Sequence, residues 1–226
     1  GELDQLTRVD FFTSHEGLHL LYEQALTRAD HRQHGYYNLS THLPWIGDRT
    51  RAIDGAHVEY FRGIRNPIGV KVGNTIAADE LIDLIKVLNP ENTPGRLTLI
   101  HGFGVDKIAS KLPILATAVR QANLNVLWSC DAMHGNTHAT RNGFKTRSFD
   151  DITSEIISAF RIHRECGTRL GGIHLELTGE DVTECVGGPA NLTESDLPRD
   201  YRSQVDPRLN YEQAMEIAFL LSEQHK

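Results

Sequence analysis

Cysteine is scarce in this sequence. The three cysteines, Cys130, Cys166 and Cys185, are odd in number, and none belongs to a CxxC pair. A disulfide framework needs paired cysteines and a structural zinc knuckle needs closely spaced ones, so neither is expected to support the fold. We expect reduced thiols and a cytoplasmic location.

The sequence also lacks long runs of one character. No apolar stretch approaches the roughly 20 residues of a spanning helix, and no basic-then-apolar signal pattern opens the sequence, so we expect no membrane association. The formal net charge is -7 without blocks of like charge, which argues against nucleic-acid binding. With 39% hydrophobic and 23% charged residues among 226, we expect a globular chain with a single catalytic domain over residues 1–226.

What the sequence does have is an alternation of strand-like and helix-like segments, which predicts an α/β fold with parallel strands. Buried strands are expected near 67–71, 96–101, 125–131 and 172–178, and "YNLSTHLPW" is the one other segment of strand character. Helices are expected from Ser14, from near Asp48, over 75–88, over 105–122 with a break at Pro113, after an N-cap at Ser148, and from near Asn210. The polar segment 180–208 is expected to be a functional loop.

This order of elements predicts a (β/α)8 TIM-barrel type of fold, of which the chain holds only the later strands. A complete barrel takes typically about 250 residues, and four strands are too few to close one. In such barrels the chemistry lies at the carboxyl ends of the strands. Polar residues of this sequence gather at those ends, and they are the candidates for a functional site.

One imidazole and two carboxylates follow neighbouring strands. His134 comes just after the strand at 125–131, Glu176 ends the next strand, and Asp206 lies in the loop beyond. Such a mixed nitrogen and oxygen set suits Mn, Fe, Co or Zn better than Ca or Mg. With twelve histidines and thirty acidic residues, a chance triple is the competing interpretation. His174 shares a strand face with Glu176 and is expected to be a packing residue rather than a ligand.

Basic residues near the same ends are candidates for binding anions. Lys71 lies inside the strand "IGVKVG", where a lysine faces either a polar cavity or solvent. Asp48 and Arg49 stand at an expected helix start, where backbone N–H groups and a guanidinium can hold a phosphate or carboxylate. Lys145 and Arg147 in "GFKTR" offer a second phosphate site. The competing interpretation is that Asp48 caps the helix and the basic groups are solvated.

Six segments carry a resemblance to a known family. "WIGDRTRAIDGAH", "RNPIGVKVG", "PGRLTL", "CDAMHGNTH" with "GFKTR", "GGIHLELTGEDVTECVGG" and "DPRLN" stand in a consistent order. Together they resemble the type II 3-deoxy-D-arabino-heptulosonate 7-phosphate (DAHP) synthases. The resemblance covers nearly all of this chain and the C-terminal half of a usual family member.

The resemblance implies a function and a set of site residues. Family members are (β/α)8 barrels that condense phosphoenolpyruvate with erythrose 4-phosphate in the shikimate pathway, using a divalent metal, commonly Mn or Co. By the resemblance, His134, Glu176 and Asp206 are metal ligands. Arg49 and Lys71 would hold the phosphoenolpyruvate anion, with the backbone near Asp48 assisting.

Departures from the family pattern leave alternatives open. A cysteine ligand and an arginine of the early barrel strands have no match here, so we expect a partner subunit that supplies the N-terminal half, or self-association. A further donor-binding arginine is replaced by Gly102 in "HGFG". The chain could therefore be a related aldolase with another keto-acid donor or sugar acceptor, or a non-catalytic subunit.

Overall fold

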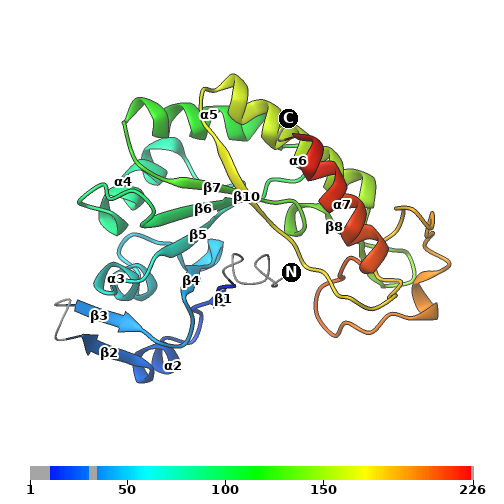
Figure 1. The fold of residues 1–226 in the computed structure, drawn as a ribbon, viewed down its shortest axis with the longest axis horizontal. Coiled ribbons are helices and arrows are strands. Elements are labelled where there is room, and N and C mark those ends of the chain that lie inside the picture. The colour runs from blue at the N-terminus through cyan, green and yellow to red at the C-terminus, as the bar shows by residue number, and fades with distance from the viewer. Residues whose placement is uncertain (1–10, 31–34, 225–226) are drawn as a thin grey trace, which may run out of the picture. The chain divides into compact units, whose positions relative to one another are not determined.

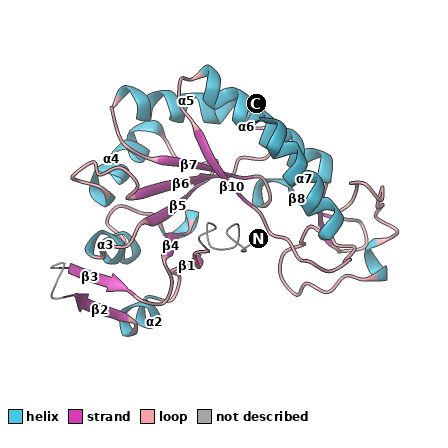
Figure 2. Ribbon diagram, in the orientation of Figure 1, coloured by secondary structure: helices cyan, strands magenta, loops and turns pink. Residues whose placement is uncertain are grey.

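The computed structural model of this chain describes residues 11–30 and 35–224. Within these residues a six-stranded sheet runs in the order β1 (Ser14–Glu16), β4 (Leu43–Ile46), β5 (Ile68–Val72), β6 (Leu97–His101), β7 (Leu127–Asp131) and β10 (Leu170–His174) (Figures 1 and 2). Two hairpins form separate two-stranded sheets. Strand β1 pairs with β4, β4 with β5, and β7 with β10, all in parallel. The α/β class with a parallel sheet is thereby confirmed.

The chain divides into two compact units, which are described separately. The first comprises Gly1–Lys71, Glu80–Leu99 and Leu124–Val126, and the second comprises Val72–Asp79, Ile100–Asn123 and Leu127–Lys226. No helix in the described part of the chain is both long and apolar enough to cross a membrane.

The first unit contains the early strands. Its described elements are β1 (Ser14–Glu16), α2 (Leu20–Ala25), the β2–β3 hairpin (Thr27–Asp30 and Gly35–Asn38), β4 (Leu43–Ile46), α3 (Ala56–Gly63), most of β5 (Ile68–Val72) and most of α4 (Ala78–Leu88). Its core forms where Ile68 and Val70 of β5 are fully buried with Leu81 and Ile85 of α4. The i, i+4 spacing of those leucine and isoleucine residues is what gives α4 its buried face.

Two helix predictions in this unit were wrong. Ser14 does not cap a helix: its hydroxyl donates to the Leu43 carbonyl at 2.5 Å, in the parallel pair of β1 with β4, and the helix begins only at Leu20. The helix expected from Asp48 begins at Ala56, because Asp48 opens only a 3-10 turn and accepts a hydrogen bond from Arg51 instead of capping. Ser14 instead contacts a residue distant in sequence, and Asp48 instead forms a local ion pair with Arg51.

The second unit contains the later strands and three long helices. They are β7 (Leu127–Asp131), the β8–β9 hairpin (Thr137–Ala139 and Lys145–Arg147), β10 (Leu170–His174), α5 (Ile108–Gln121), α6 (Phe149–Glu165) and α7 (Tyr211–Gln224). Strand β6 (Leu97–His101) begins in the first unit and ends in this one. The predicted Ser148 N-cap is confirmed, since its hydroxyl accepts from the Asp151 N–H at 3.3 Å.

Helix α5 is not interrupted at Pro113, as the sequence had suggested. The helix continues to Gln121, and Leu112, Leu115 and Ala116 on either side of the proline are buried. Inside a helix a proline removes one hydrogen bond and crowds the carbonyl one turn earlier, and the buried apolar face outweighs that cost. Strand β10 ends at His174, so Glu176 lies in the loop after the strand rather than within it. From Glu180 to Arg208 the chain forms one short 3-10 turn (Leu197–Arg199) and isolated β-bridges at Val186, Gly187 and Leu192, and it is otherwise irregular, as expected of a loop.

Candidate metal centre

The loop after β7 is organised by a buried carboxylate. Asp131, the last residue of β7, has a side chain only 2% exposed. Its Oδ1 atom accepts hydrogen bonds from the backbone N–H groups of Met133 at 3.0 Å and His134 at 3.2 Å. Its Oδ2 atom lies 2.7 Å from Nδ1 of the His134 imidazole. One carboxylate thus shapes the turn and orients the ring.

This contact determines which nitrogen of His134 is available. An ionised carboxylate can only accept, so Nδ1 carries the proton and Nε2 presents its lone pair. The Nε2 atom lies 3.6 Å from Oε1 of Glu176 and 4.0 Å from Oδ2 of Asp206. One ligand atom from each of the three residues lies within 4.8 Å of the others. The three residues named from the sequence are therefore together in the second unit.

Glu176 is held at both its backbone and its side chain. Its carbonyl accepts from the Leu209 N–H at 2.9 Å, which ties the loop after β10 to the segment following Asp206. Its Oε2 atom accepts from the guanidinium of Arg147, so that Oε1 is the atom facing His134. The carboxylate is about 29% exposed, so it is still open to a bound ion.

Arg147 is fully buried, which rules out the alternative that its side chain is solvated. Its Nε donates to the Thr137 hydroxyl at 2.8 Å, and its Nη1 donates to Glu176 and to the Pro207 carbonyl, next to Asp206. The buried Nη2 atom has no hydrogen-bond partner among the described residues. The hydrogen bonds of Nε and Nη1 offset the cost of burying the guanidinium charge away from water. Arg147 therefore contacts the loops that carry two of the three clustered acids.

The loop that bears Asp206 is built around a second buried carboxylate, Glu184. It accepts from the backbone N–H groups of Arg202, Ser203 and Arg208 at 2.8–3.1 Å, and from the Arg208 guanidinium at 2.8 and 3.0 Å. Burial opposes ionisation, but these hydrogen bonds outweigh it and lower the pKa of Glu184 below its usual value. Glu184 was not predicted from the sequence, where an acid between Val182 and Val186 in "VTECV" was the available signal.

The side chain of Lys145 completes the surroundings of Asp206. Its Nζ lies 3.3 Å from Oδ1 of Asp206, which leaves Oδ2 directed at His134. Beside it is an open pocket of about 560 Å³ whose lining includes Lys145, Tyr201, Ser203 and Asp206. The exposed side chain of Lys145 borders this pocket, whereas Arg147 is buried. Anion binding by these two residues stays a prediction.

A third buried carboxylate, Glu155 of α6, was also missed. It accepts from the N–H groups of Phe103 and Gly104 at 3.1 and 3.0 Å and from Asn136 at 2.7 Å. It thereby ties the loop after β6 to the loop that carries His134. Burial raises the pKa of Glu155 to about 7, although its three donors act in the opposite direction. Helical spacing was the available signal, because Glu155 lies on the same face of α6 as the buried Ile152 and Ala159.

Asp48, Arg49 and Lys71 lie in the first unit and are described by themselves. Asp48 accepts from Arg51 Nε at 2.9 Å, and the Arg49 side chain is exposed. Lys71 is partly buried at the end of β5, with Nζ 5.0 Å from the centroid of the Trp45 ring, a cation–π distance. The lysine is thus neither fully solvated nor buried in the apolar core.

Comparisons with known proteins agree with the resemblance noted in the sequence. A family model described as "Class-II DAHP synthetase family" matches residues 1–222. A Neurospora crassa protein named phospho-2-dehydro-3-deoxyheptonate aldolase is 49% identical over 239 residues, which covers 99% of this chain and 50% of the relative. A Streptomyces coelicolor protein of the same name is 49% identical over 218 residues, which covers 96% and 48%. The chain spans about half the length of the curated relatives it matches.

Proposed function

The chain belongs to the class-II DAHP synthetase family, and on that premise we propose that it takes part in a metal-dependent, DAHP-synthase-type condensation. The substrates would be phosphoenolpyruvate and erythrose 4-phosphate, the pair implied by the resemblance. The catalytic domain would be of (β/α)8 type, with the parallel sheet of this chain as part of the barrel.

The observation that carries the proposal is the arrangement of His134, Glu176 and Asp206. Each has one polar atom engaged by a neighbour and another directed at a common point. Asp131 engages Nδ1 of the imidazole, Arg147 engages Oε2 of Glu176, and Lys145 engages Oδ1 of Asp206. Ligands oriented from behind in this way are typical of metal centres.

The donor set fits the metal that the resemblance implies. An imidazole nitrogen and two carboxylate oxygens suit Mn or Co. Three protein ligands leave coordination positions free for further ligands, and the resemblance implies a cysteine as one of these. When bound, such an ion polarises the carbonyl oxygen of an aldehyde as a Lewis acid.

The basic residues of the chain would bind and orient the substrates. Lys145, exposed at the 560 Å³ pocket, would hold the phosphate group of the sugar. Arg49 and Lys71, with the backbone near Asp48, would hold the phosphoenolpyruvate anion. Fixing two reactants in one orientation supplies part of the rate acceleration by itself. Arg147 we assign to positioning, since a buried guanidinium already engaged by Glu176 and Pro207 orients the ligand loops rather than a substrate.

A related aldolase with a different keto-acid donor is the second candidate, and one observation favours it. A Cβ atom added at Gly102 would lie 2.9 Å from the Asp131 carbonyl oxygen. The donor-binding arginine that the family resemblance places there therefore has no room without a shift of the backbone. An altered donor site would follow from this.

The first test measures the metal alone. Titration of Mn²⁺ followed by electron paramagnetic resonance should show binding by the chain, and Glu176→Gln and Asp206→Asn should each weaken it by about tenfold or more. Asp181→Asn, at an exposed aspartate outside the cluster, is the matched control and should bind as the unsubstituted chain does. Equal Mn²⁺ affinities in all four proteins would rule out the proposed metal centre.

The second test measures the reaction. With Mn²⁺ or Co²⁺ present, consumption of phosphoenolpyruvate should depend on erythrose 4-phosphate and should be lost in His134→Ala. The assay is run on the chain alone and, because a partner subunit with the N-terminal half is predicted, also with that subunit. Metal binding without turnover of this pair, but with turnover of another keto acid, would favour the second candidate.

A further inference from the structure

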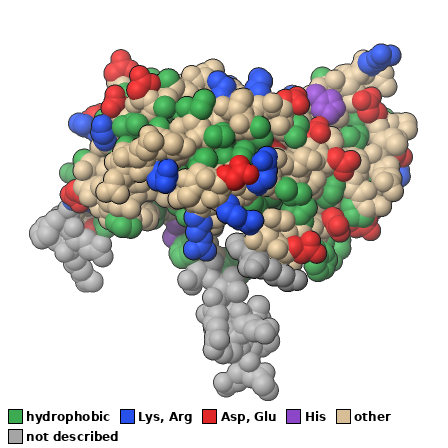
Figure 3. All heavy atoms as spheres, turned by 90° about the horizontal axis from the view of Figure 1, so that it is seen from above, with side chains coloured by type: hydrophobic (Ala, Val, Ile, Leu, Met, Phe, Trp, Pro, Cys, Tyr) green, Lys and Arg blue, Asp and Glu red, His purple; other side chains and the backbone are tan. Residues whose placement is uncertain are grey.

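A second pocket lies in the first unit and is rich in arginine. It has a volume of about 490 Å³, and its lining includes Tyr36, Arg62, Ile64, Arg65, Leu88 and Arg96. We call it the arginine pocket. On the face of the molecule shown in Figure 3, basic and acidic side chains are interspersed, and the whole chain has a net charge of -7. A pocket lined by three arginines therefore differs from the mixed charge of that face and from the net negative charge of the chain.

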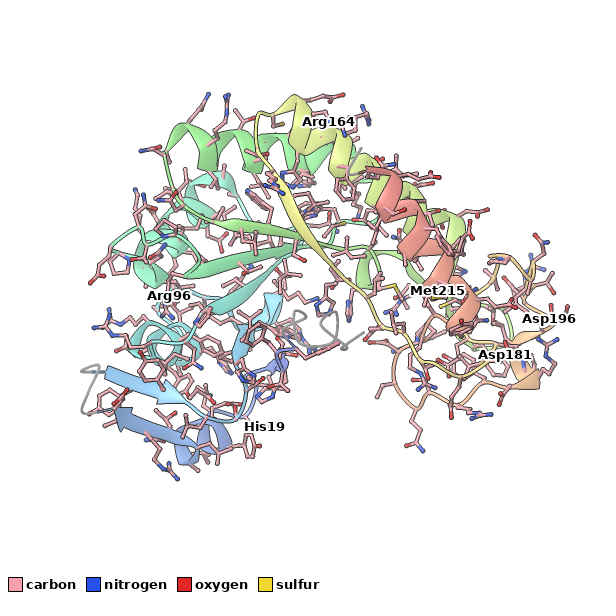
Figure 4. All side chains as sticks on the ribbon, viewed as in Figure 1. His19, Arg96, Arg164, Asp181, Asp196 and Met215 are labelled. Atoms are coloured by element: carbon pink, nitrogen blue, oxygen red, sulfur yellow. The ribbon has the colours of Figure 1, made fainter. Side chains whose placement is uncertain are left out.

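The charge of Arg96 is not offset by an acid in the described part of the chain. Arg96, labelled in Figure 4, directly precedes β6 and donates to the backbone carbonyls of Asn66 and Phe61. Both acceptors are neutral. Burial, together with the nearby positive charge of Arg65, lowers the pKa of Arg96. Two guanidinium groups thus repel one another across this pocket, with the inner one partly desolvated.

The neighbouring arginines differ in their partners. Arg62 is paired with Glu59, at 2.7 and 3.1 Å, so its charge is already balanced. Arg65 has an exposed side chain with no ion pair among the described residues, but its position is restricted. Its backbone N–H donates to the Tyr36 carbonyl at 2.7 Å, and its side chain packs against Gly35, where an added Cβ would lie 2.5 Å from Arg65 Cγ. Glu91 also lines the pocket but forms no ion pair with either guanidinium in the described residues.

The arginine pocket lies at the opposite end of the strands from Lys71. Arg65 and Arg96 precede β5 and β6, whereas Lys71 is near the carboxyl end of β5. The length of a five-residue strand separates these ends by roughly 16 Å. Substrates of parallel α/β folds bind at the carboxyl ends, so a ligand in this pocket would be bound at a separate site.

We propose that the arginine pocket binds the phosphate group of a small phosphorylated molecule. Guanidinium groups match the oxygens of a phosphate through paired N–H donors. A dianion placed between Arg65 and Arg96 also replaces their mutual repulsion by two attractions, which a monoanionic carboxylate does only in part. The volume lies within the range of small-molecule pockets and leaves room beside the phosphate for an organic group against Tyr36 and Leu88.

Inorganic phosphate is the probe for this proposal. It is titrated into the full chain at constant ionic strength and followed by phosphorus NMR. Lys145→Gln is the common background, so that the pocket beside Lys145 contributes less, and the anion site proposed at Arg49 and Lys71 is the same in every variant. Arg65→Gln should weaken phosphate binding about tenfold, the size expected for a hydrogen bond between charged groups. Arg161→Gln, an exposed arginine paired with Glu165 on α6, is the matched control and should bind phosphate as the background protein does.

Two further measurements sharpen the result. Arg65→Lys keeps the charge but not the paired donors and should fall between the background protein and Arg65→Gln, which would support a direct contact over a change in folding. Acetate at the same concentrations should bind more weakly than phosphate. The proposal is overturned if Arg65→Gln and Arg161→Gln bind phosphate alike, if acetate competes equally, or if chloride reproduces the effect. None of these outcomes depends on the metal centre or on turnover.

Discussion

Asp131 and His134 form a pair in which the carboxylate oxygen Oδ2 lies 2.7 Å from the imidazole Nδ1, while the same carboxylate accepts both neighbouring backbone N–H groups through Oδ1. The turn and the ring are thus oriented by one group. The Asp131 carboxylate is buried, whereas the His134 side chain is 44% exposed. The buried residue therefore orients the ring, and the exposed residue presents Nε2. The proposed metal ligand His134 would therefore be oriented by a residue outside the proposed ligand set.

The first prediction concerns that dependence. In Asp131→Asn the backbone contacts can persist through the amide oxygen, but the amide nitrogen is then a donor facing Nδ1. The imidazole is forced to carry its proton on Nε2, the atom directed at Glu176 and Asp206. We expect the dissociation constant for Mn²⁺ to rise about 10–100-fold, as measured by titration calorimetry. Asp106→Asn, at an exposed aspartate, is the control, and an unchanged affinity in Asp131→Asn would show that the tautomer is set elsewhere.

The second prediction concerns Arg147. A lysine cannot contact Thr137, Glu176 and the Pro207 carbonyl simultaneously, so Arg147→Lys should leave buried acceptors without donors. The lysine keeps the positive charge beside Glu176 but not all of the hydrogen bonds, so we expect the free energy of unfolding to fall by roughly 1–3 kcal/mol, the cost of a buried polar group left without a partner. Urea titration with a chelator present measures this without any contribution from metal.

Arg161→Lys is the control for that measurement. Arg161 and Glu165 form an exposed pair on α6, each 59% exposed. Exposed pairs contribute little, so the change should stay below about 0.5 kcal/mol. Similar losses in the two variants would mean that the buried position of Arg147 has no energetic consequence.

Local sequence patterns predicted much of this fold. The strand with Lys71, helix α4 and the Ser148 cap were found because their signals lie within a few neighbouring residues. The short strand β1 was missed, since three residues paired with Leu43–Trp45 have no periodicity of their own. A strand of this kind is specified by its partner and not by its own composition.

The candidate site likewise has residues that local patterns predict and residues that depend on distant partners. His134, Glu176 and Asp206 could be named because they stand in recognisable segments after strands. The buried location of Arg147 could not be predicted, because it depends on Thr137, Glu176 and Pro207 arriving from three separate segments. For Glu155 and Glu184 the local signal is only an acid among apolar residues. Their partners are backbone N–H groups of distant loops and the side chains of Asn136 and Arg208, which no local pattern connects to them.

The third prediction concerns stability against pH. His101 and His163 are buried, and burial lowers their pKa values from 6.5 to about 3 and about 4. The unfolded chain therefore binds more protons below pH 6.5 than the folded chain does. The stability due to the two neutral rings is complete above about pH 6.5 and is lost as the pH falls toward 4, by up to about 1.4 kcal/mol per pH unit for each ring.

His101→Phe tests this through a slope rather than an absolute value. The ring at position 101 stacks on Phe103, with centroids 5.5 Å apart, so an apolar ring is compatible with its surroundings. Urea titrations between pH 6.5 and 4 should show a dependence flatter by about one proton. His138→Gln, at an exposed histidine of β8, should keep the original slope. Equal slopes in all three proteins would mean that His101 titrates normally.

Glu155 acts in the opposite direction over part of this range. Its pKa is raised from 4.5 to about 7, so the folded state binds the extra proton. Its contribution is fully present below about pH 4.5 and is lost as the pH rises through 7. Glu155→Gln should remove this opposing slope, and the pH dependence between 4.5 and 6.5 should become steeper. The same series of urea titrations measures it, and an unchanged slope would contradict the raised pKa.

The last prediction concerns space at Gly102. A Cβ atom there would lie 2.9 Å from the carbonyl oxygen and 3.4 Å from the Cβ of Asp131, and a backbone atom cannot rotate away. Gly102→Ala should therefore lower the free energy of unfolding by roughly 1–3 kcal/mol and, by displacing Asp131, weaken Mn²⁺ binding as well. Gly63→Ala is the control, since an added Cβ there meets nothing within 4 Å. Equal stability of the two variants would mean that the backbone at Asp131 moves aside without a cost in free energy. Lack of space would then not explain why position 102 has no arginine, and a different donor substrate would remain as the explanation.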